Sequence, residues 1–164
     1  MVFIKEIVPK KAITFIANTL YQEHYETQKM KHEIIEAEDA STFIYQWKNN
    51  DQWNTIQLQT AKKPKEIEIN SEAEFITEHY FGYTKIDMET TFEYEVQHPR
   101  WEQLEVLNHK IDINFQENYG NDFELLQNTV PTSVFLAKGS VIEVKNKRKL
   151  EVSDLFTEHG LNYE

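Results

Sequence analysis

The stretch SEAEFITEHYFGYTK, residues 71–85, carries the densest set of aromatic and ionisable side chains in the chain. Ser71 and Glu74 have the spacing of a capping box, in which side-chain oxygens accept hydrogen bonds from backbone N–H groups at a helix start. One face of this helix is then apolar and aromatic, and consists of Phe75, Ile76, His79 and Tyr80. We expect a short helix over residues 71–80, ended by Gly82 because glycine readily takes a positive φ.

The sequence on both sides of this stretch predicts strands. Upstream, Phe43, Tyr45 and Trp47 alternate with polar residues, a turn follows at 49–51, and a second extended run covers 53–60. Downstream, residues 91–98, TFEYEVQH, alternate aromatic or apolar side chains with acidic or amide ones. This period of two is typical of a strand with one face buried and the other in solvent.

The remaining segments predict further strands and a few short helices. Residues 2–8 indicate a buried strand, and the apolar spacing after Pro9 indicates a helix from Lys10 to Tyr21. The other predictions are strands at 25–35, 66–69, 102–107 and 109–113, a loop with a helical turn at 115–126, two strands at 133–137 and 140–144 around a Lys138–Gly139 turn, and a helix at 154–159.

These elements predict an α+β fold with a mainly antiparallel, curved sheet or partial β-barrel and two or three short helices. A chain of 164 residues is long enough to bury a core, so we expect a single domain over residues 1–164. The expected core includes Phe15, Tyr45, Trp53, Phe92, Tyr94, Ile113 and Phe135.

Composition excludes several classes of partner. The formal net charge of −11 repels phosphate backbones, and we interpret the basic run KNKRK at 145–149 as a solvated turn, so no nucleic acid is expected. The chain has no cysteine, which excludes disulfides and thiolate metal sites. No apolar run is long enough for a membrane span and no signal-peptide pattern opens the chain, so we expect a cytoplasmic protein without a membrane partner.

The central stretch also supplies candidate ligand-binding residues. Glu78, His79, Tyr80 and Tyr83 offer a carboxylate, an imidazole and two phenols, which can orient or protonate a small ligand. The predicted set is completed by Tyr21, Glu23 and Arg100, the last being the one plausible anion-binding arginine. The alternative interpretation is that these aromatic residues are simply core, in a structural or interaction domain without a ligand.

Metal and lysine chemistry receive little support. The tripeptide Glu-His-Tyr occurs at 23–25 and 78–80, yet no closely spaced histidine pair accompanies it, so no metal and no other cofactor is expected. Lys62 and Lys63 form an adjacent pair of the kind that can activate a Schiff-base amine. The sequence KKPK is more typical of a solvated turn, and catalytic residues stay unknown.

Several stretches together resemble the C-terminal two-thirds of the YqjF-like family of bacterial proteins. They are VFIKEIVPK at 2–10, NTLYQEHY at 18–25, FITEHYFGY at 75–83, HPRW at 98–101 and SVFLAKGS at 133–140. That family is grouped with acetoacetate-decarboxylase-like proteins, so the resemblance implies a cone-like antiparallel barrel or curved double sheet that encloses a pocket. We therefore favour a protein that binds a small carbonyl-bearing or anionic molecule over a structural domain. The resemblance also raises the alternative of a Schiff-base lyase, but the polar, proline-broken stretch that holds Lys62 and Lys63 argues against it.

The chain departs from the family pattern in two ways. Family members carry a further block of strands before the stretch that resembles VFIKEIVPK, and its absence here would expose sheet edges, so we expect a homo-oligomer. The decarboxylase lysine follows a Met-Gly-Tyr strand end, whereas residues 60–63 read TAKK. No catalytic residue is therefore transferred from the decarboxylase.

Overall fold

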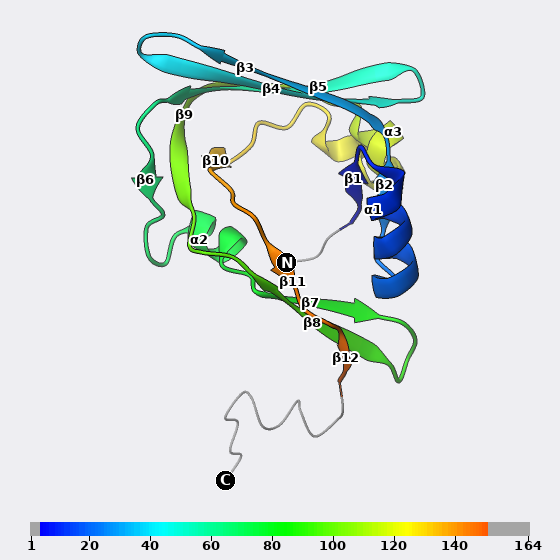
Figure 1. Cartoon of the computed structure of the whole chain (residues 1–164). Helices are drawn as coiled ribbons and strands as arrows, with labels where there is room; N and C mark the ends of the chain where they lie inside the picture. Colours follow the sequence, from blue (N-terminus) through cyan, green and yellow to red (C-terminus); the bar gives the residue numbers. More distant parts are fainter. Residues whose placement is uncertain (1–3, 151–164) are drawn as a thin grey trace. The chain divides into compact units, whose positions relative to one another are not determined.

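The computed structural model describes residues 4–150 (Figure 1), so the helix predicted at 154–159 lies outside the described residues. The chain divides into two compact units. Unit 1 comprises Met1–Thr77 and Arg100–Gly139, and unit 2 comprises Glu78–Pro99 and Ser140–Glu164. The single domain over residues 1–164 stays a prediction.

A long antiparallel sheet forms the centre of unit 1. Its strands are β3 (Lys29–Glu36), β4 (Ala40–Asn49), β5 (Gln52–Ala61), β9 (Glu102–Asp112) and β10 (Phe135–Ala137), in the order β10-β9-β5-β4-β3, and β6 (Lys65–Glu66) also pairs with β9. The predicted hairpin is confirmed as β4 and β5. Its turn is made by Asn50 and Asp51, with φ of 40° and 70°, a backbone conformation that these two residue types tolerate better than most.

The strand register separates an apolar face from a polar face. Leu58 lies opposite Phe43 on one neighbouring strand and His109 on the other. Because side chains alternate along a strand, these residues share a face with Trp47 and Ile113, both of which are buried. The opposite face of β9 carries polar residues such as Asn108 and Lys110. The core of unit 1 therefore lies on one side of the sheet.

Two short parallel strands stand apart from this sheet, β1 (Glu6–Val8) and β2 (Tyr25–Thr27). They are joined by α1 (Lys11–Ile16) and a π-helical turn, η1 (Ala17–Tyr21), which confirms the helix predicted from Lys10 to Tyr21. Asn18 fixes the return, because its side chain accepts a hydrogen bond from Tyr25 N and donates one to Tyr25 O. The placement of Phe15 and Tyr45 in the core was wrong, since Phe15 on α1 is 70% exposed and Tyr45 on β4 is 38% exposed.

Strand β9 is one continuous element, whereas the sequence predicted two. The pairing shifts at Leu107, because Gln59 lies opposite Asn108 while Thr60 lies opposite Val106. Such a bulge inserts an extra residue and interrupts the alternation without ending the strand. The segment 115–126, expected as a loop with a helical turn, is more helical than predicted and forms α3 (Phe115–Tyr119) and the 3-10 helix η2 (Asn121–Leu126).

The capping box of the central stretch is confirmed, but the predicted helix end is wrong. Ser71 Oγ accepts a hydrogen bond from Glu74 N at 3.1 Å, and α2 (Glu72–Thr77) follows. Gly82 lies inside the strand β7 (Phe81–Lys85), opposite Tyr94. A Cβ atom at Gly82 would lie 2.2 Å from Tyr94 Cζ, so any other residue here would have to displace the aromatic ring beside it.

Unit 2 is a small antiparallel sheet built on β8 (Thr91–Gln97), the strand that the sequence predicts most clearly. Its other strands are β7, β11 (Glu143–Val144) and β12 (Arg148–Lys149), and all three pair with β8. The two strands expected around Lys138–Gly139 do not form a hairpin, since β10 joins the sheet of unit 1 and β11 that of unit 2. Glu93, expected in solvent, is 5% exposed and accepts a hydrogen bond from Arg148 Nε at 2.8 Å.

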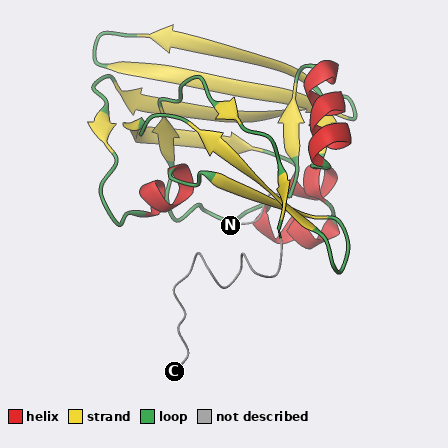
Figure 2. Cartoon of the chain, turned by 60° about the horizontal axis from the view of Figure 1, so that its bottom comes forward, coloured by secondary structure: helices red, strands yellow, loops and turns green. Residues whose placement is uncertain are grey.

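The mainly antiparallel α+β class is confirmed, and Figure 2 shows the predominance of strands over short helices. The two sheets of three or more strands that the structure describes are open, and neither closes into a barrel. Across residues 4–150, no helix has both the length and the apolar character needed to cross a membrane.

Candidate ligand-binding site

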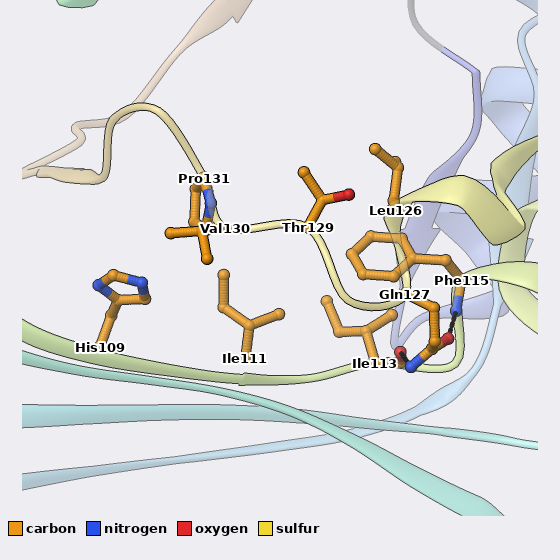
Figure 3. Close-up of a pocket in the computed structure, with 9 residues that line it drawn as sticks. All are labelled: His109, Ile111, Ile113, Phe115, Leu126, Gln127, Thr129, Val130 and Pro131. Carbon is orange, nitrogen blue, oxygen red and sulfur yellow. Dashed lines mark hydrogen bonds between the residues drawn. The ribbon is translucent and has the colours of Figure 1, made fainter.

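A cavity of about 340 Å³ lies on the apolar face of the unit 1 sheet (Figure 3). Its floor is a single row of side chains, His109, Ile111 and Ile113, which follow one another at every second residue along β9 and just past its end. The alternation of a strand therefore turns all three toward the cavity. The wall opposite consists of Phe115, Leu126, Gln127, Thr129, Val130 and Pro131.

The wall is held in place by its own polar groups. Gln127 Nε2 donates a hydrogen bond to Ile113 O at 2.9 Å, and Gln127 Oε1 accepts one from Phe115 N at 3.2 Å. These two bonds, drawn in Figure 3, tie the end of η2 to the start of α3. Thr129 Oγ1 donates to Leu125 O at 2.8 Å. The polar groups of the wall are thus largely engaged with the backbone.

A buried polar network supports the end of the floor. Asn118, 1% exposed, accepts a hydrogen bond from Trp47 Nε1 at 2.8 Å and donates to Asn54 Oδ1 at 2.8 Å. Asn54 Oδ1 also accepts from Asn114 N at 2.9 Å. Because buried polar groups are costly unless they are bonded, this network fixes α3 against the sheet and thereby positions Phe115.

His109 is the polar group that the cavity leaves accessible. The side chain is exposed, and among residues 4–150 its ring takes part in no hydrogen bond or ion pair. Of the aspartates and glutamates that the structure describes, none lines the cavity. The arrangement is an apolar trough with an imidazole at one end, which can contact a ligand oxygen through its N–H.

Four of the predicted ligand-binding residues lie in unit 2, and the structure brings two of them together. The Tyr80 hydroxyl donates a short hydrogen bond to Glu78 Oε2. The Tyr80 ring also packs on His98, with centroids 4.9 Å apart, a neighbour that the predicted set did not include. Glu78 Oε1 is buried and has no hydrogen-bond partner in the described chain. His79 is half-buried, and Tyr83 is 58% exposed on β7.

The other three predicted residues belong to unit 1 and do not form one cluster. Arg100 pairs with Glu74 Oε1 at 2.6 Å and donates to Ile67 O at 2.9 Å, so it holds α2 to the preceding chain. Tyr21 is the last residue of η1. Glu23 lies near Glu6, and its negative charge adds to the effect of burial in raising the pKa of the Glu6 carboxyl.

Tyrosines extend this acidic group toward the cavity wall. Burial raises the pKa of Tyr25, and the negative charges of Glu6 and Glu23 raise it further. Burial and then Glu6 likewise raise the pKa of Tyr119. The Tyr119 ring lies 6.3 Å from that of Phe115, a residue of the cavity wall. The Tyr119 ring thus lies beside a residue of the cavity wall, and its hydroxyl is close enough to Glu6 for the carboxylate charge to affect its pKa.

The lysine pair and the metal hypothesis find no geometric support. Lys62 and Lys63 are exposed, and Lys62 pairs with Glu36 at 3.4 Å, whereas a Schiff-base lysine must be desolvated or lie beside another cation. Within residues 4–150, no group of three or more histidine, aspartate or glutamate side chains is arranged to hold a metal ion.

The cavity was missed by sequence reasoning for an identifiable reason. The alternation of His109, Ile111 and Ile113 was a visible signal for one face of a strand. The opposite wall comes from 126–131, an irregular segment whose position is set by the side chain of Gln127. No periodic pattern marks such a wall.

Comparison with known proteins gives one family. The model of DUF2071, described as an uncharacterized conserved protein, matches residues 1–141. Neither the curated proteins nor the solved structures yield a match to the chain.

Proposed function

This chain belongs to the DUF2071 family of uncharacterized conserved proteins, and we propose that it binds a small carbonyl-bearing or anionic molecule in the cavity on the apolar face of unit 1. The observation that carries the proposal is the cavity itself, which combines apolar walls with one accessible imidazole. Ligand sites are typically concave, mostly apolar and about 300–1,000 Å³ in volume, with a few polar groups that set orientation. The cavity of about 340 Å³ fits the lower end of that range.

The sequence resemblance supports the same proposal. The stretches shared with the YqjF-like family suggest a relationship to acetoacetate-decarboxylase-like proteins, whose fold encloses a pocket. We infer a binding protein and not a Schiff-base lyase, because Lys62 and Lys63 are exposed. Borohydride treatment in the presence of acetoacetate should therefore leave the mass of both lysines unchanged, and a stable adduct on either one would favour the Schiff-base lyase instead.

A ligand screen by thermal shift tests the proposal. A molecule that binds only the folded state raises stability by about 2.7 kcal/mol at a concentration of one hundred times its dissociation constant. We expect short-chain keto acids or carboxylates to raise the melting temperature, and His109→Ala to reduce the shift. Lys110→Ala changes the opposite face of the same strand and is the matched control. If no compound of the panel shifts the wild-type protein, the proposal fails and the alternative of a structural or interaction domain is favoured.

A second candidate site is favoured by the hydrogen bond between Tyr80 and Glu78 and by the buried, unpartnered Glu78 Oε1. An acceptor without a donor is costly in a buried position, so a ligand N–H group is a suitable partner for it. Primary amines are added to the same panel, and these amines should bind less tightly to Glu78→Gln than to the wild type. Glu89→Gln, at an exposed carboxyl of the same unit, is the matched control.

A further inference from the structure

The cavity is elongated along β9, and this shape restricts the shape of its ligand. His109, Ile111 and Ile113 lie in one line along the floor, and Figure 3 shows Phe115 beyond Ile113 at the far end. With a rise of about 3.3 Å per residue, the row from His109 to Ile113 is about 13 Å long. The floor is one side chain wide, because within the described part of the chain it is built by β9 and the residue after it. A long and narrow trough fits an unbranched chain better than a ring.

The polarity of the trough is also uneven along its length. At the far end, Ile113, Phe115 and Leu126 present apolar side chains. The amide of Gln127 is bonded to backbone at both its nitrogen and its oxygen, and the Thr129 hydroxyl donates to Leu125 O. His109 stands at the opposite end with a ring that no group in the described chain engages. The polar end of a ligand is therefore expected at His109.

The chemistry of the polar end follows from the groups that line the cavity. An imidazole donates an N–H to a carbonyl or carboxylate oxygen, and its protonated form adds a favourable charge for an anion. Among residues 4–150, no acidic side chain lines the cavity to attract an ammonium group. Resting on the function proposed above, we propose that the ligand is an unbranched acyl chain, with its oxygen at His109 and its terminal methyl group toward Phe115.

Titration with straight-chain carboxylates from butanoate to decanoate tests this ligand class. Each buried methylene is worth about 0.8 kcal/mol, so the dissociation constant should fall roughly fourfold per added methylene until the trough is filled, and then level off. His109→Ala should weaken every member by a similar factor of at least about ten, because it removes only the contact with the oxygen. The fourfold step per methylene should persist in this variant.

Two tryptophan variants and a branched isomer of octanoate test whether binding depends on the long, narrow shape of the trough. Leu126→Trp fills the far end and should weaken octanoate and decanoate while sparing butanoate. Val130→Trp, on a side chain that is 77% exposed, blocks the middle of the trough and serves if the first variant does not fold. Lys110→Ala should change nothing. The branched isomer 2-propylpentanoate should bind at least tenfold more weakly than octanoate.

The outcomes separate this inference from the function on which it rests. If carboxylates or keto acids bind but show no dependence on chain length, or if the branched isomer binds as well as octanoate, the acyl-chain inference is wrong while ligand binding stands. If octan-1-amine binds more tightly than octanoate, the assignment of the polar end is wrong. If no compound of either kind binds, the proposed function fails as well.

Discussion

At the scale of single residues, Asn118 shows how one buried amide can organise the end of a sheet. It satisfies the indole N–H of Trp47 and bonds with Asn54, at 1% exposure. Asn118→Leu would remove these bonds and leave the indole N–H buried without an acceptor. We expect a loss of about 2–4 kcal/mol in the free energy of unfolding, measured by urea titration. Asn121→Ala, on an exposed side chain, should cost less than about 0.5 kcal/mol, and equal losses would contradict this role.

A second prediction at this scale concerns the pH dependence of stability. Burial and then the charge of Glu23 raise the pKa of Glu6. A carboxyl with a higher pKa in the folded than in the unfolded state binds its proton more tightly when folded, so its ionisation destabilises the fold at neutral pH. Glu6→Gln should therefore raise the melting temperature at pH 7. The gain should vanish below the ordinary pKa of 4.5, where Glu6 is protonated in both states.

Glu26, on the neighbouring strand β2, provides a control of opposite sign. Hydrogen bonds from Lys5 and then Gln28 lower the pKa of this carboxyl. A lowered pKa stabilises the fold above the ordinary value, and that stabilisation disappears as the pH falls through the folded pKa. Glu26→Gln should thus lower the melting temperature at pH 7, with a smaller effect in acid. If both variants shift in the same direction, the assigned electrostatics are wrong.

At the scale of elements, β7 packs against the ring of Tyr94 on β8 at Gly82. An added Cβ would lie 2.2 Å from Tyr94 Cζ, so the ring must move if Gly82 is replaced. We expect Gly82→Ala to cost about 1–3 kcal/mol of unfolding free energy, as other overpacked sites do. In a Tyr94→Ala background the same change should be close to neutral. A double-mutant cycle with no coupling between the two positions would contradict the steric explanation.

Local patterns predicted the elements well and their ends less well. The hairpin of β4 and β5, the strand β8 and the start of α2 follow from alternation, turn residues and a capping box. The sequence predicted Gly82 to follow a helix. The actual reason for a glycine at this position is a tertiary contact, the close approach of the Tyr94 ring, which the local sequence does not reveal. The bulge at Leu107 likewise depends on pairing with β5, which no local window contains.

The candidate site was harder to predict than the fold. One face of β9 follows from the alternation of His109, Ile111 and Ile113. The wall at 126–131 is positioned by hydrogen bonds of Gln127 to distant backbone atoms, and such bonds leave no periodic signal. Among the predicted residues, the structure joins Glu78 to Tyr80, whereas it places Arg100 in an ion pair with Glu74.

At the scale of the whole molecule, the predicted homo-oligomer has a candidate contact in β3. Among the described strands, β3 pairs with β4 alone, and it carries Ile34 and Ile35, one on each face of the sheet, which are 50% and 47% exposed. Unpaired edges favour association between chains. Light scattering at micromolar concentration should give a dimer or a larger species. Ile35→Lys should shift the population toward monomer, and a monomeric wild-type protein would refute the prediction.

The two units are interleaved along the chain, because the polypeptide passes from one to the other after Thr77, after Pro99 and after Gly139. During synthesis, neither sheet can be completed before its last segment leaves the ribosome. A single break after Pro99 would give two fragments, each with a share of both units. Fragments 1–99 and 100–164 are therefore suited to a fragment-complementation experiment, because each fragment lacks strands that the other supplies to both units.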